Sequence, residues 1–241
     1  MNAQSLNSTT PVALVTGGTR GIGLAIARGL VAQGYQVVAA ARTAVSLPEG
    51  VTFTALDITD SNAVNRCIEN LPRLDVLVNN AGLVGAISPD QPNLPLWDQI
   101  MATNLNAAWY SSSAALQRLP DRTGRIINIA SVLGLRGVPD QPAYCAAKHG
   151  LIGLTRSLAL YAAPRGITVN AICPGWVLTD MALQRFEDLG LSPSQAAASI
   201  PLGRMTTPEE VGALVAFLAG PGAASITGQA IVVDGGCNAA A

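Results

Sequence analysis

The chain has 241 residues, of which 49% are hydrophobic and 12% are charged. So large an apolar fraction can bury a substantial core, which excludes an intrinsically disordered chain. The net charge is −1, from 14 basic and 15 acidic residues that form no basic run. This balance argues against a nucleic-acid groove and against an anionic membrane surface, so we expect neither partner.

The spacing of the cysteines and the composition of the first residues indicate the cellular compartment in which the protein is expected. Cys67, Cys145, Cys173 and Cys237 are far apart and form no CxxC motif or Cys/His cluster. This spacing predicts reduced thiols and no metal site. Residues 1–10 are polar and lack the features of a signal peptide, and no apolar run reaches the roughly 18–20 residues that span a bilayer. We therefore expect a cytoplasmic protein.

Short apolar, β-branched runs alternate with longer amphipathic stretches along the chain. In chain order, strands are expected at residues 12–16, 37–41, 52–57, 75–79, 125–130, 168–173 and 230–234, and helices at 22–33, 61–71, 96–119, 144–163 and 208–218. Most strands are apolar on both faces, which is typical of a parallel sheet covered on both sides. The pattern predicts an α/β fold: one Rossmann-like, doubly wound domain over residues 11–241, with a seven-stranded parallel sheet, helices on both faces, and a polar tail at 1–10.

The connection between the second and third strands is unusually short. Residues 42–51 include Pro48 and Gly50 and are too few for the helix that normally joins parallel strands. We therefore expect a loop or a single turn in this crossover.

A glycine-rich turn follows the first strand. It reads TGGTRGIG from Thr16 to Gly23, and the expected helix begins within it. Gly17 and Gly21 can adopt backbone angles closed to other residues, and Gly23 can let the helix pack closely on the sheet. The free N–H groups and the dipole of the helix start would then face a diphosphate. The spacing G-x-x-x-G-x-G is not G-x-G-x-x-G, but its place between a strand and a helix predicts nucleotide binding.

Two arginines indicate the form of the nucleotide. An acidic residue about 20 positions beyond the glycines would hold the ribose 2′-hydroxyl of NAD, but Arg42 ends the second strand instead. Arg20 lies in the glycine turn. Two guanidinium groups can grip a 2′-phosphate, so the sequence favours NADP(H), with NAD(H) as the alternative.

Tyr144 and Lys148 are four residues apart on an expected helix, so they share one helix face. The pKa of a free tyrosine is about 10, and a nearby cation typically lowers a pKa by about 1–3. Together with an oxidised nicotinamide, the Lys148 ammonium is therefore expected to bring the phenol toward the range of general acid–base catalysis.

Other polar residues stand where strands end or inside a helix. Ser131 follows the fifth strand, at the carboxyl end of the sheet, where ligands bind in open α/β folds. Residues 79–82, Asn-Asn-Ala-Gly, close the fourth strand and suit the flank of a cofactor, although such residues also form ordinary turns. Asn104 is a poor helix former inside an expected helix, which suggests a specific role.

These motifs together resemble the short-chain dehydrogenase/reductase family in both order and spacing, from residue 12 to residue 236. The motifs that carry the resemblance are residues 16–23 and 79–82, Asn104, Ser131, Tyr144 with Lys148, and Pro174-Gly175. The segments IPLGR at 200–204, PEEV at 208–211, ITG at 226–228 and VDGG at 233–236 are similar to the 3-oxoacyl-thioester and polyketide ketoreductase branch.

The resemblance implies a role for each catalytic candidate. Tyr144 would exchange a proton with the substrate oxygen, and Ser131 would polarise the carbonyl. Lys148 would bind the nicotinamide ribose and depress the pKa of Tyr144. Asn104 would hold a water molecule that links Lys148 to solvent as a proton relay.

The resemblance also assigns the positions around the cofactor. Gly17, Thr19, Arg20, Gly21, Ile22 and Gly23 would hold the diphosphate and adenosine, Arg42 the 2′-phosphate, Asp57 and Ile58 the adenine, Asn80, Ala81 and Gly82 the central wall, and Pro174, Gly175, Val177 and Thr179 the carboxamide. Tyr144 and Lys148 would touch the cofactor as well. Residues 180–205 have the length of the family's substrate lid.

The implied activity is that of an NADP-dependent oxidoreductase that interconverts a ketone and a secondary alcohol. The resemblance further implies a homotetramer built on the two long helices, and a small carbonyl or alcohol as substrate. Two alternatives stay open: an NAD-dependent secondary alcohol dehydrogenase on the same fold, and a non-catalytic nucleotide-sensing protein.

Overall fold

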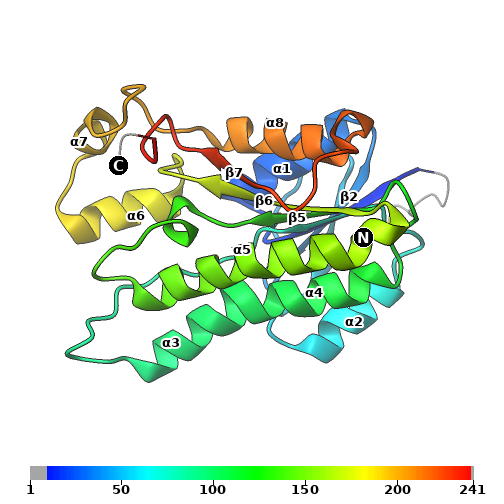
Figure 1. The fold of residues 1–241 in the computed structure, drawn as a ribbon, viewed down its shortest axis with the longest axis horizontal. Coiled ribbons are helices and arrows are strands. Elements are labelled where there is room, and N and C mark those ends of the chain that lie inside the picture. The colour runs from blue at the N-terminus through cyan, green and yellow to red at the C-terminus, as the bar shows by residue number, and fades with distance from the viewer. Residues whose placement is uncertain (1–9, 240–241) are drawn as a thin grey trace.

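The computed structural model describes residues 10–239, and a seven-stranded parallel sheet forms the centre of the fold (Figure 1). In chain order, the strands are β1 (Val12–Thr16), β2 (Gln36–Ala41), β3 (Val51–Ala55), β4 (Val76–Asn79), β5 (Arg125–Ile129), β6 (Thr168–Pro174) and β7 (Ala230–Val233). Their order across the sheet is β3-β2-β1-β4-β5-β6-β7. The direction of winding therefore reverses between β1 and β4, where open α/β sheets bind their ligands.

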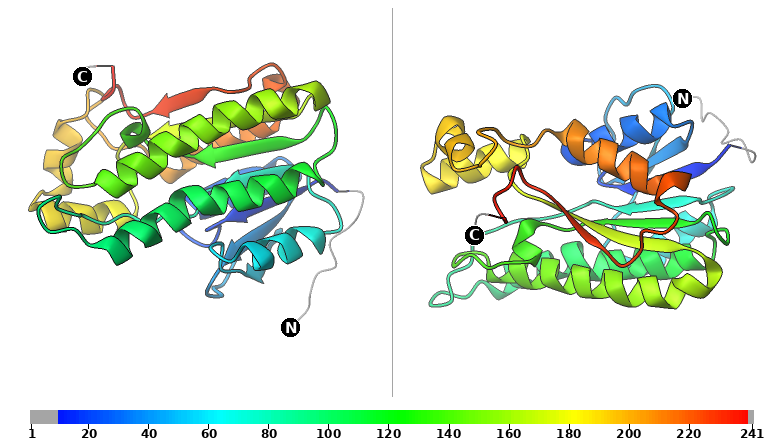
Figure 2. Two further views of the ribbon diagram at one scale, coloured as in Figure 1. Left: turned by 60° about the horizontal axis from the view of Figure 1, so that its bottom comes forward. Right: turned by 45° about the horizontal axis from the view of Figure 1, so that its top comes forward.

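Helices cover both faces of the sheet. The α-helices of the described residues are α1 (Gly21–Ala32), α2 (Ser61–Glu69), α3 (Leu94–Met101), α4 (Ala107–Leu116), α5 (Pro142–Ala162), α6 (Asp180–Leu189), α7 (Pro193–Ala198) and α8 (Pro208–Ala219). Figures 1 and 2 show α1 and α8 on one face and α2, α4 and α5 on the other, with α6 and α7 beyond the carboxyl ends of the strands.

The first strand shows why the sheet is parallel and buried. All five residues of β1 are buried. Ala13 and Val15 belong to the apolar cluster formed with α1 and α8, while Val12 and Leu14 belong to the cluster formed with α2, α4 and α5. Apolar residues at four successive positions, pointing alternately to the two faces, are what a strand covered on both faces requires, so the predicted fold class is confirmed.

Two elements differ from the sequence-based expectation. The helix expected at 96–119 is present over residues 94–116, but a π-helical turn that was not expected, Ala102–Asn106, lies between α3 and α4. The Asn104 side chain donates to the Ile100 carbonyl at 3.0 Å and so competes for a helix acceptor, which accounts for the wider turn. The helices α6 and α7 were not expected. Residues 42–50, by contrast, contain no helix, as expected for the short crossover.

Residues 10–239 contain neither a membrane-spanning helix nor a cluster of metal ligands. This part of the chain has no helix long and apolar enough to cross a membrane. It also has no group of three or more His, Cys, Asp or Glu side chains placed to hold a metal ion. The polar tail expected at 1–10 lies, apart from residue 10, outside the described residues.

Candidate active site

The glycine turn after β1 has the geometry that its sequence predicts. Gly17 and Gly21 have φ values of 64° and 50°, in the left-handed region that favours glycine. Arg20 occupies the N-cap of α1 but makes no side-chain cap hydrogen bond, and the first turn of α1 contains no acidic residue. The N–H groups of this helix start therefore remain available to an anion such as a diphosphate.

Gly23 allows the close approach of α1 to the carboxyl edge of the sheet. A Cβ atom at this position would lie 2.1 Å from the Gly17 carbonyl oxygen and 2.6 Å from the Asn80 Nδ2 atom. The close contacts are therefore made by the glycine turn after β1 and by the residue that follows β4.

Thr16 and Asn80 join the ends of β1 and β4. The Thr16 hydroxyl oxygen accepts hydrogen bonds from the backbone N–H groups of Asn80 and Ala81, at 3.0 and 3.1 Å. The Asn80 amide donates to the carbonyl oxygens of Thr16 and Gly17, at 2.9 and 3.2 Å. The Asn80 side chain therefore holds the glycine turn in place, and the contribution of the Thr16 hydroxyl was missed by sequence reasoning.

Arg20, Arg42 and Asp57 lie in the part of the site expected to bind adenosine. All three are exposed, and Arg42 directly follows β2. Asp57 Oδ1 accepts from the Thr59 backbone N–H at 2.9 Å and from its hydroxyl at 2.7 Å. These two hydrogen bonds, and then the positive charge of Arg42, lower the pKa of Asp57. The lowered pKa keeps Asp57 ionised at neutral pH.

Tyr144 and Lys148 extend from the same face of α5. The Lys148 ammonium nitrogen lies 5.5 Å from the centre of the Tyr144 ring. Lys148 is 3% exposed, and its ammonium group donates to the Ile129 carbonyl at the end of β5, at 2.7 Å. Ser131, which is 8% exposed, follows the same strand, and its hydroxyl is near enough to Tyr144 to act against the rise in the pKa of the phenol. The structure therefore brings these three predicted residues together.

The pKa of Tyr144 is shifted in the direction opposite to the one expected. Burial raises it to about 12, and the hydrogen bond with Ser131 offsets only part of this rise. Burial also lowers the pKa of Lys148 to about 8. The expected depression of the Tyr144 pKa by Lys148 is thus wrong for the protein alone, because desolvation of the phenolate is the larger effect.

Asn104 and Gly82 lie next to Lys148. Asn104 is buried, its Oδ1 atom accepts from the Leu83 N–H at 3.0 Å, and its Nδ2 atom donates to the Leu83 carbonyl at 2.7 Å. A Cβ atom on Gly82 would lie 3.0 Å from Asn104 Oδ1 and 4.0 Å from Lys148 Nζ, so the glycine keeps space between these two side chains.

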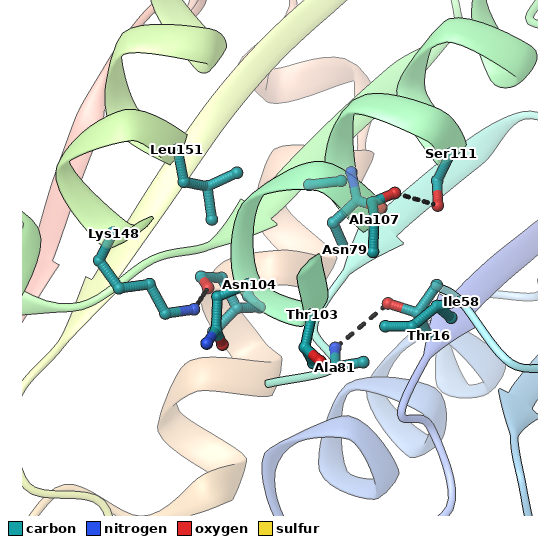
Figure 3. Close-up of a pocket in the computed structure, with 12 residues that line it drawn as sticks. Thr16, Ile58, Asn79, Ala81, Thr103, Asn104, Ala107, Ser111, Lys148 and Leu151 are labelled. Atoms are coloured by element: carbon teal, nitrogen blue, oxygen red, sulfur yellow. Dashed lines mark hydrogen bonds between the residues drawn. The ribbon is translucent and has the colours of Figure 1, made fainter. Parts of the chain in front are cut away.

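Asn104 and Lys148 also line one small cavity (Figure 3). Its volume is about 10 Å³, and its other lining residues include Thr16, Asn79 and Ser111. A polar cavity of this size accommodates about one water molecule.

The segment that follows β6 passes close to the glycine turn that follows β1. A Cβ atom on Gly175 would lie 2.7 Å from the Asp234 Cβ atom, so glycine is needed where this segment passes the end of β7. Val177 forms an isolated parallel bridge with Thr206. The Thr179 Cγ2 atom would be 3.5 Å from a Cβ on Gly21, which places the start of α6 beside the predicted phosphate site.

Several features of the site were not expected from the sequence. Gln141, at the N-cap of α5, is 5% exposed, and its side chain makes no cap hydrogen bond. The Trp176 and Phe186 rings pack with their centres 4.7 Å apart. Ser192 and Gln195 form a capping box at the start of α7. That S-x-x-Q spacing is a local signal that could have revealed α7.

The residues around this edge of the sheet fit a nicotinamide dinucleotide. The glycine turn offers unpaired N–H groups to a diphosphate, and side chains at Gly17 or Gly23 would close the space. A Ser–Tyr–Lys cluster lies at the same sheet edge, where it can exchange a proton with a reacting oxygen. Fold and site together define an oxidoreductase.

Comparison with known proteins gives the family. Residues 17–238 match the family model described as enoyl-(acyl carrier protein) reductase. The chain belongs to the short-chain dehydrogenase/reductase family.

Three similar proteins have names that indicate related activities. A Streptomyces virginiae protein named as a ketoacyl reductase of the monensin polyketide synthase is 44% identical over 95% of this chain and 97% of its own length. A 3-oxoacyl-(acyl-carrier-protein) reductase of Vibrio harveyi is 38% identical, over 96% of this chain and 98% of its own. A solved variant of actinorhodin polyketide ketoreductase with NADPH is 37% identical, with a TM-score of 0.88 and coverages of 96% and 98%.

Proposed function

We propose that this protein is an NADPH-dependent oxidoreductase that reduces a ketone to a secondary alcohol, or catalyses the reverse reaction. The observation that carries the proposal is the cluster of Tyr144, Ser131 and Lys148 at the carboxyl end of β5. Two hydroxyl groups that converge on one point suit a substrate oxygen, which accepts hydrogen bonds as a carbonyl and gains a proton on reduction.

Tyr144 acts as the general acid in the direction of reduction. Because the pKa of its phenol is about 12, it holds its proton at neutral pH and can donate it to the oxygen as negative charge develops there. Ser131 donates a hydrogen bond to the same oxygen and stabilises that charge. The bound nicotinamide supplies the hydride. In the reverse direction, Tyr144 accepts the proton of the alcohol.

Lys148 and Asn104 replace the proton that Tyr144 gives up. The Lys148 ammonium, with a pKa of about 8, is mostly charged at neutral pH, and it also holds the ribose hydroxyls of the nucleotide. Asn104 lines the same small cavity, where one water molecule can link Lys148 to solvent. These roles make Asn104, Ser131, Tyr144 and Lys148 the catalytic set.

Arg20 and Arg42 select the phosphorylated nucleotide by contacting its 2′-phosphate. The exposed positions of Arg20, at the N-cap of α1, and of Arg42, directly after β2, support this assignment. So does the NADPH of the solved ketoreductase that the chain resembles. Use of NAD(H) is the alternative, because Asp57 also lies near Arg42.

The substrate is a ketone with an apolar chain, and a 3-oxoacyl thioester is the class that the relatives' names favour. Leu178, Met181 and Leu183, at the start of the lid, are exposed apolar side chains that can contact such a chain. A simple apolar ketone satisfies the same contacts.

A homotetramer in the cytoplasm completes the proposal. Trp109 on α4 and Leu160 and Tyr161 on α5 are 48%, 79% and 73% exposed, and apolar side chains this exposed favour an interface between copies of the chain. Light scattering coupled to size-exclusion chromatography measures the assembly, and a monomeric mass would contradict this part of the proposal.

The activity is tested by following NADPH absorbance with acetoacetyl-CoA, simple ketones and, with NADP⁺, secondary alcohols. We expect turnover with at least one ketone and a preference for NADPH over NADH. If NADPH binds tightly but none of the substrates reacts, the non-catalytic nucleotide-sensing alternative is favoured instead.

A further inference from the structure

Residues 180–199, the part of the expected lid segment 180–205 that contains α6 and α7, lie beyond the carboxyl ends of the strands and are called the lid below (Figures 1 and 2). The buried apolar side chains of this lid, Ala182, Phe186 and Ala196, form a cluster with Trp176 and Met205. All five residues belong to the segment 176–205. This apolar packing therefore stabilises the lid itself.

The hydrogen bonds of the lid also stay almost entirely within the lid and the residues that flank it. Within the part of the chain that the structure describes, all but one of the hydrogen bonds made by residues 180–199 join them to residues 179–200. The exception is an ion pair in which the Arg185 guanidinium donates to the Asp140 carboxylate. The side chain of Arg185 is only 12% exposed, and that of Asp140 is 40% exposed.

Asp140 is held on its other side by the body of the protein. Its carbonyl oxygen accepts a hydrogen bond from the Ile87 N–H at 2.9 Å, in the loop that follows β4. Asp140 also lies four residues before Tyr144, immediately ahead of the N-cap of α5. One residue thus connects the lid, the loop after β4, and the helix that carries Tyr144 and Lys148.

We propose that Arg185 and Asp140 are positioning residues that fasten the substrate lid to the segment leading into α5. Neither side chain needs to touch the reacting atoms. The ion pair sets the distance between the lid and Tyr144, so that the substrate is held and shielded from water while the proton is transferred. This inference rests on the proposed function, because the lid acts on the substrate of that reaction.

The pair is expected to affect substrate binding more than cofactor binding. The predicted cofactor residues all lie outside 180–199, and the segment that reaches the glycine turn is separately held, because Thr206 and Trp176 are joined by a backbone hydrogen bond of 3.0 Å. Loss of the pair should therefore raise KM for the ketone while the Kd for NADPH stays within about twofold. Because charged side chains in direct contact are energetically coupled, we expect loss of the pair to raise KM about tenfold.

The test compares Asp140→Asn, Arg185→Gln, the double variant and the reversed pair Asp140→Arg/Arg185→Asp, with acetoacetyl-CoA as substrate. The matched control is Asp121→Asn, which removes the exposed ion pair Arg165–Asp121, remote from the lid. We expect each single variant to raise KM about tenfold, the double variant to be no worse than either, and the reversed pair to recover most of the loss. The control should leave KM unchanged.

Hydrogen exchange gives a readout that needs no turnover. Backbone amides of α6 should exchange about tenfold faster in Arg185→Gln than in the wild type, with Arg185→Lys between the two. Additive effects of the single variants on KM, or unchanged exchange in α6, would overturn the proposal. A wild type without turnover would instead contradict the proposed function, and the exchange measurement would still test the ion pair.

Discussion

The Lys148 ammonium nitrogen lies 5.5 Å from the centre of the Tyr144 ring, and burial shifts the two pKa values in opposite directions. The phenol is held in its protonated form, with a pKa of about 12, while the ammonium group loses its proton near a pKa of about 8. A proton donor and a group that exchanges protons with solvent near neutral pH therefore sit side by side, which is the arrangement that repeated proton delivery to a substrate oxygen requires.

Replacement of Tyr144 by Phe removes the proton donor and keeps the ring. Because general acid catalysis typically contributes 10²–10⁴-fold, we expect kcat to fall by about that factor. The Kd for NADPH, followed by NADPH fluorescence, should change little. Turnover near that of the wild type would show that another group delivers the proton.

The pH dependence of reduction should follow Lys148. As pH rises through about 8, the ammonium group loses its charge, so kcat/KM for ketone reduction should fall. Tyr144, with a pKa of about 12, stays protonated over this range and contributes no decline below pH 10. The measurement is kcat/KM between pH 6 and 10, and a flat profile would exclude Lys148 as the titrating group. Lys148→Met should have low activity without this decline.

The Lys148→Met variant is expected to lose activity but to gain stability. The pKa of Lys148 is lowered from 10.5 in the unfolded chain to about 8, so the folded protein binds fewer protons in that window and its stability rises with pH there. At 1.36 kcal/mol for each pKa unit, desolvation of the ammonium costs about 3 kcal/mol below pH 8. Lys148→Met avoids this cost. Its free energy of unfolding in urea should exceed that of the wild type at pH 7, with an advantage that shrinks toward pH 10.

Local sequence signals were enough for the sheet and for much of the site. The seven strands are short apolar runs bounded by turn residues, a pattern typical of buried parallel strands, so each was predicted to within two residues of its observed ends. Tyr144 and Lys148 were predicted to share a face because helix geometry alone places residues four apart together. The left-handed conformations of Gly17 and Gly21 were likewise predicted from the backbone freedom of glycine alone.

Features that depend on distant contacts had no local signal. The Asn104 side chain, within the π-helical turn, forms hydrogen bonds with the backbone of Leu83, 21 residues earlier in the chain. The ion pair between Arg185 and Asp140 spans 45 residues. The rise in the pKa of Tyr144 in the protein alone was not predicted, because helix spacing reveals the nearby charge but not the burial of the phenol.

Arg42 provides a test of nucleotide preference. If its guanidinium grips the 2′-phosphate, Arg42→Ala should lower the preference for NADPH over NADH by about 10–100-fold, since hydrogen bonds to charged groups contribute about 1.5–3 kcal/mol. Arg28, an exposed arginine on α1, supplies the control, and Arg28→Ala should leave the ratio of kcat/KM values unchanged. Equal ratios in the wild type and Arg42→Ala would assign the preference to other residues.

Gly23 tests the fit of the phosphate site. In Gly23→Ala, the new methyl group would lie 2.1 Å from the Gly17 carbonyl oxygen, so the glycine turn must move. We expect the Kd for NADPH to rise at least about tenfold and thermal stability to fall. Gly222→Ala is the control, because its nearest neighbour, Phe217 Cε2, is 3.5 Å away at ordinary contact distance. Normal NADPH affinity in Gly23→Ala would show that the turn does not bind the cofactor.

Asn128 tests the polar network that supports the site from beneath. It is fully buried, accepts a hydrogen bond from Asn79 at 2.8 Å and donates one to Thr155 at 2.8 Å, so it joins β4, β5 and α5. Asn128→Ala removes both bonds and leaves a cavity, so the free energy of unfolding should fall by about 2–4 kcal/mol.

Urea denaturation measures that loss, with Gln229→Ala, which truncates an exposed residue, as the control expected within about 0.5 kcal/mol of the wild type. Because Asn128 contacts neither Tyr144 nor Lys148 by hydrogen bond, kcat well below the melting temperature should change far less than stability does. A loss of kcat as large as that of Tyr144→Phe would mean instead that the network sets the position of α5 relative to the sheet, and that β5 and α5 act as one rigid support for the reacting groups.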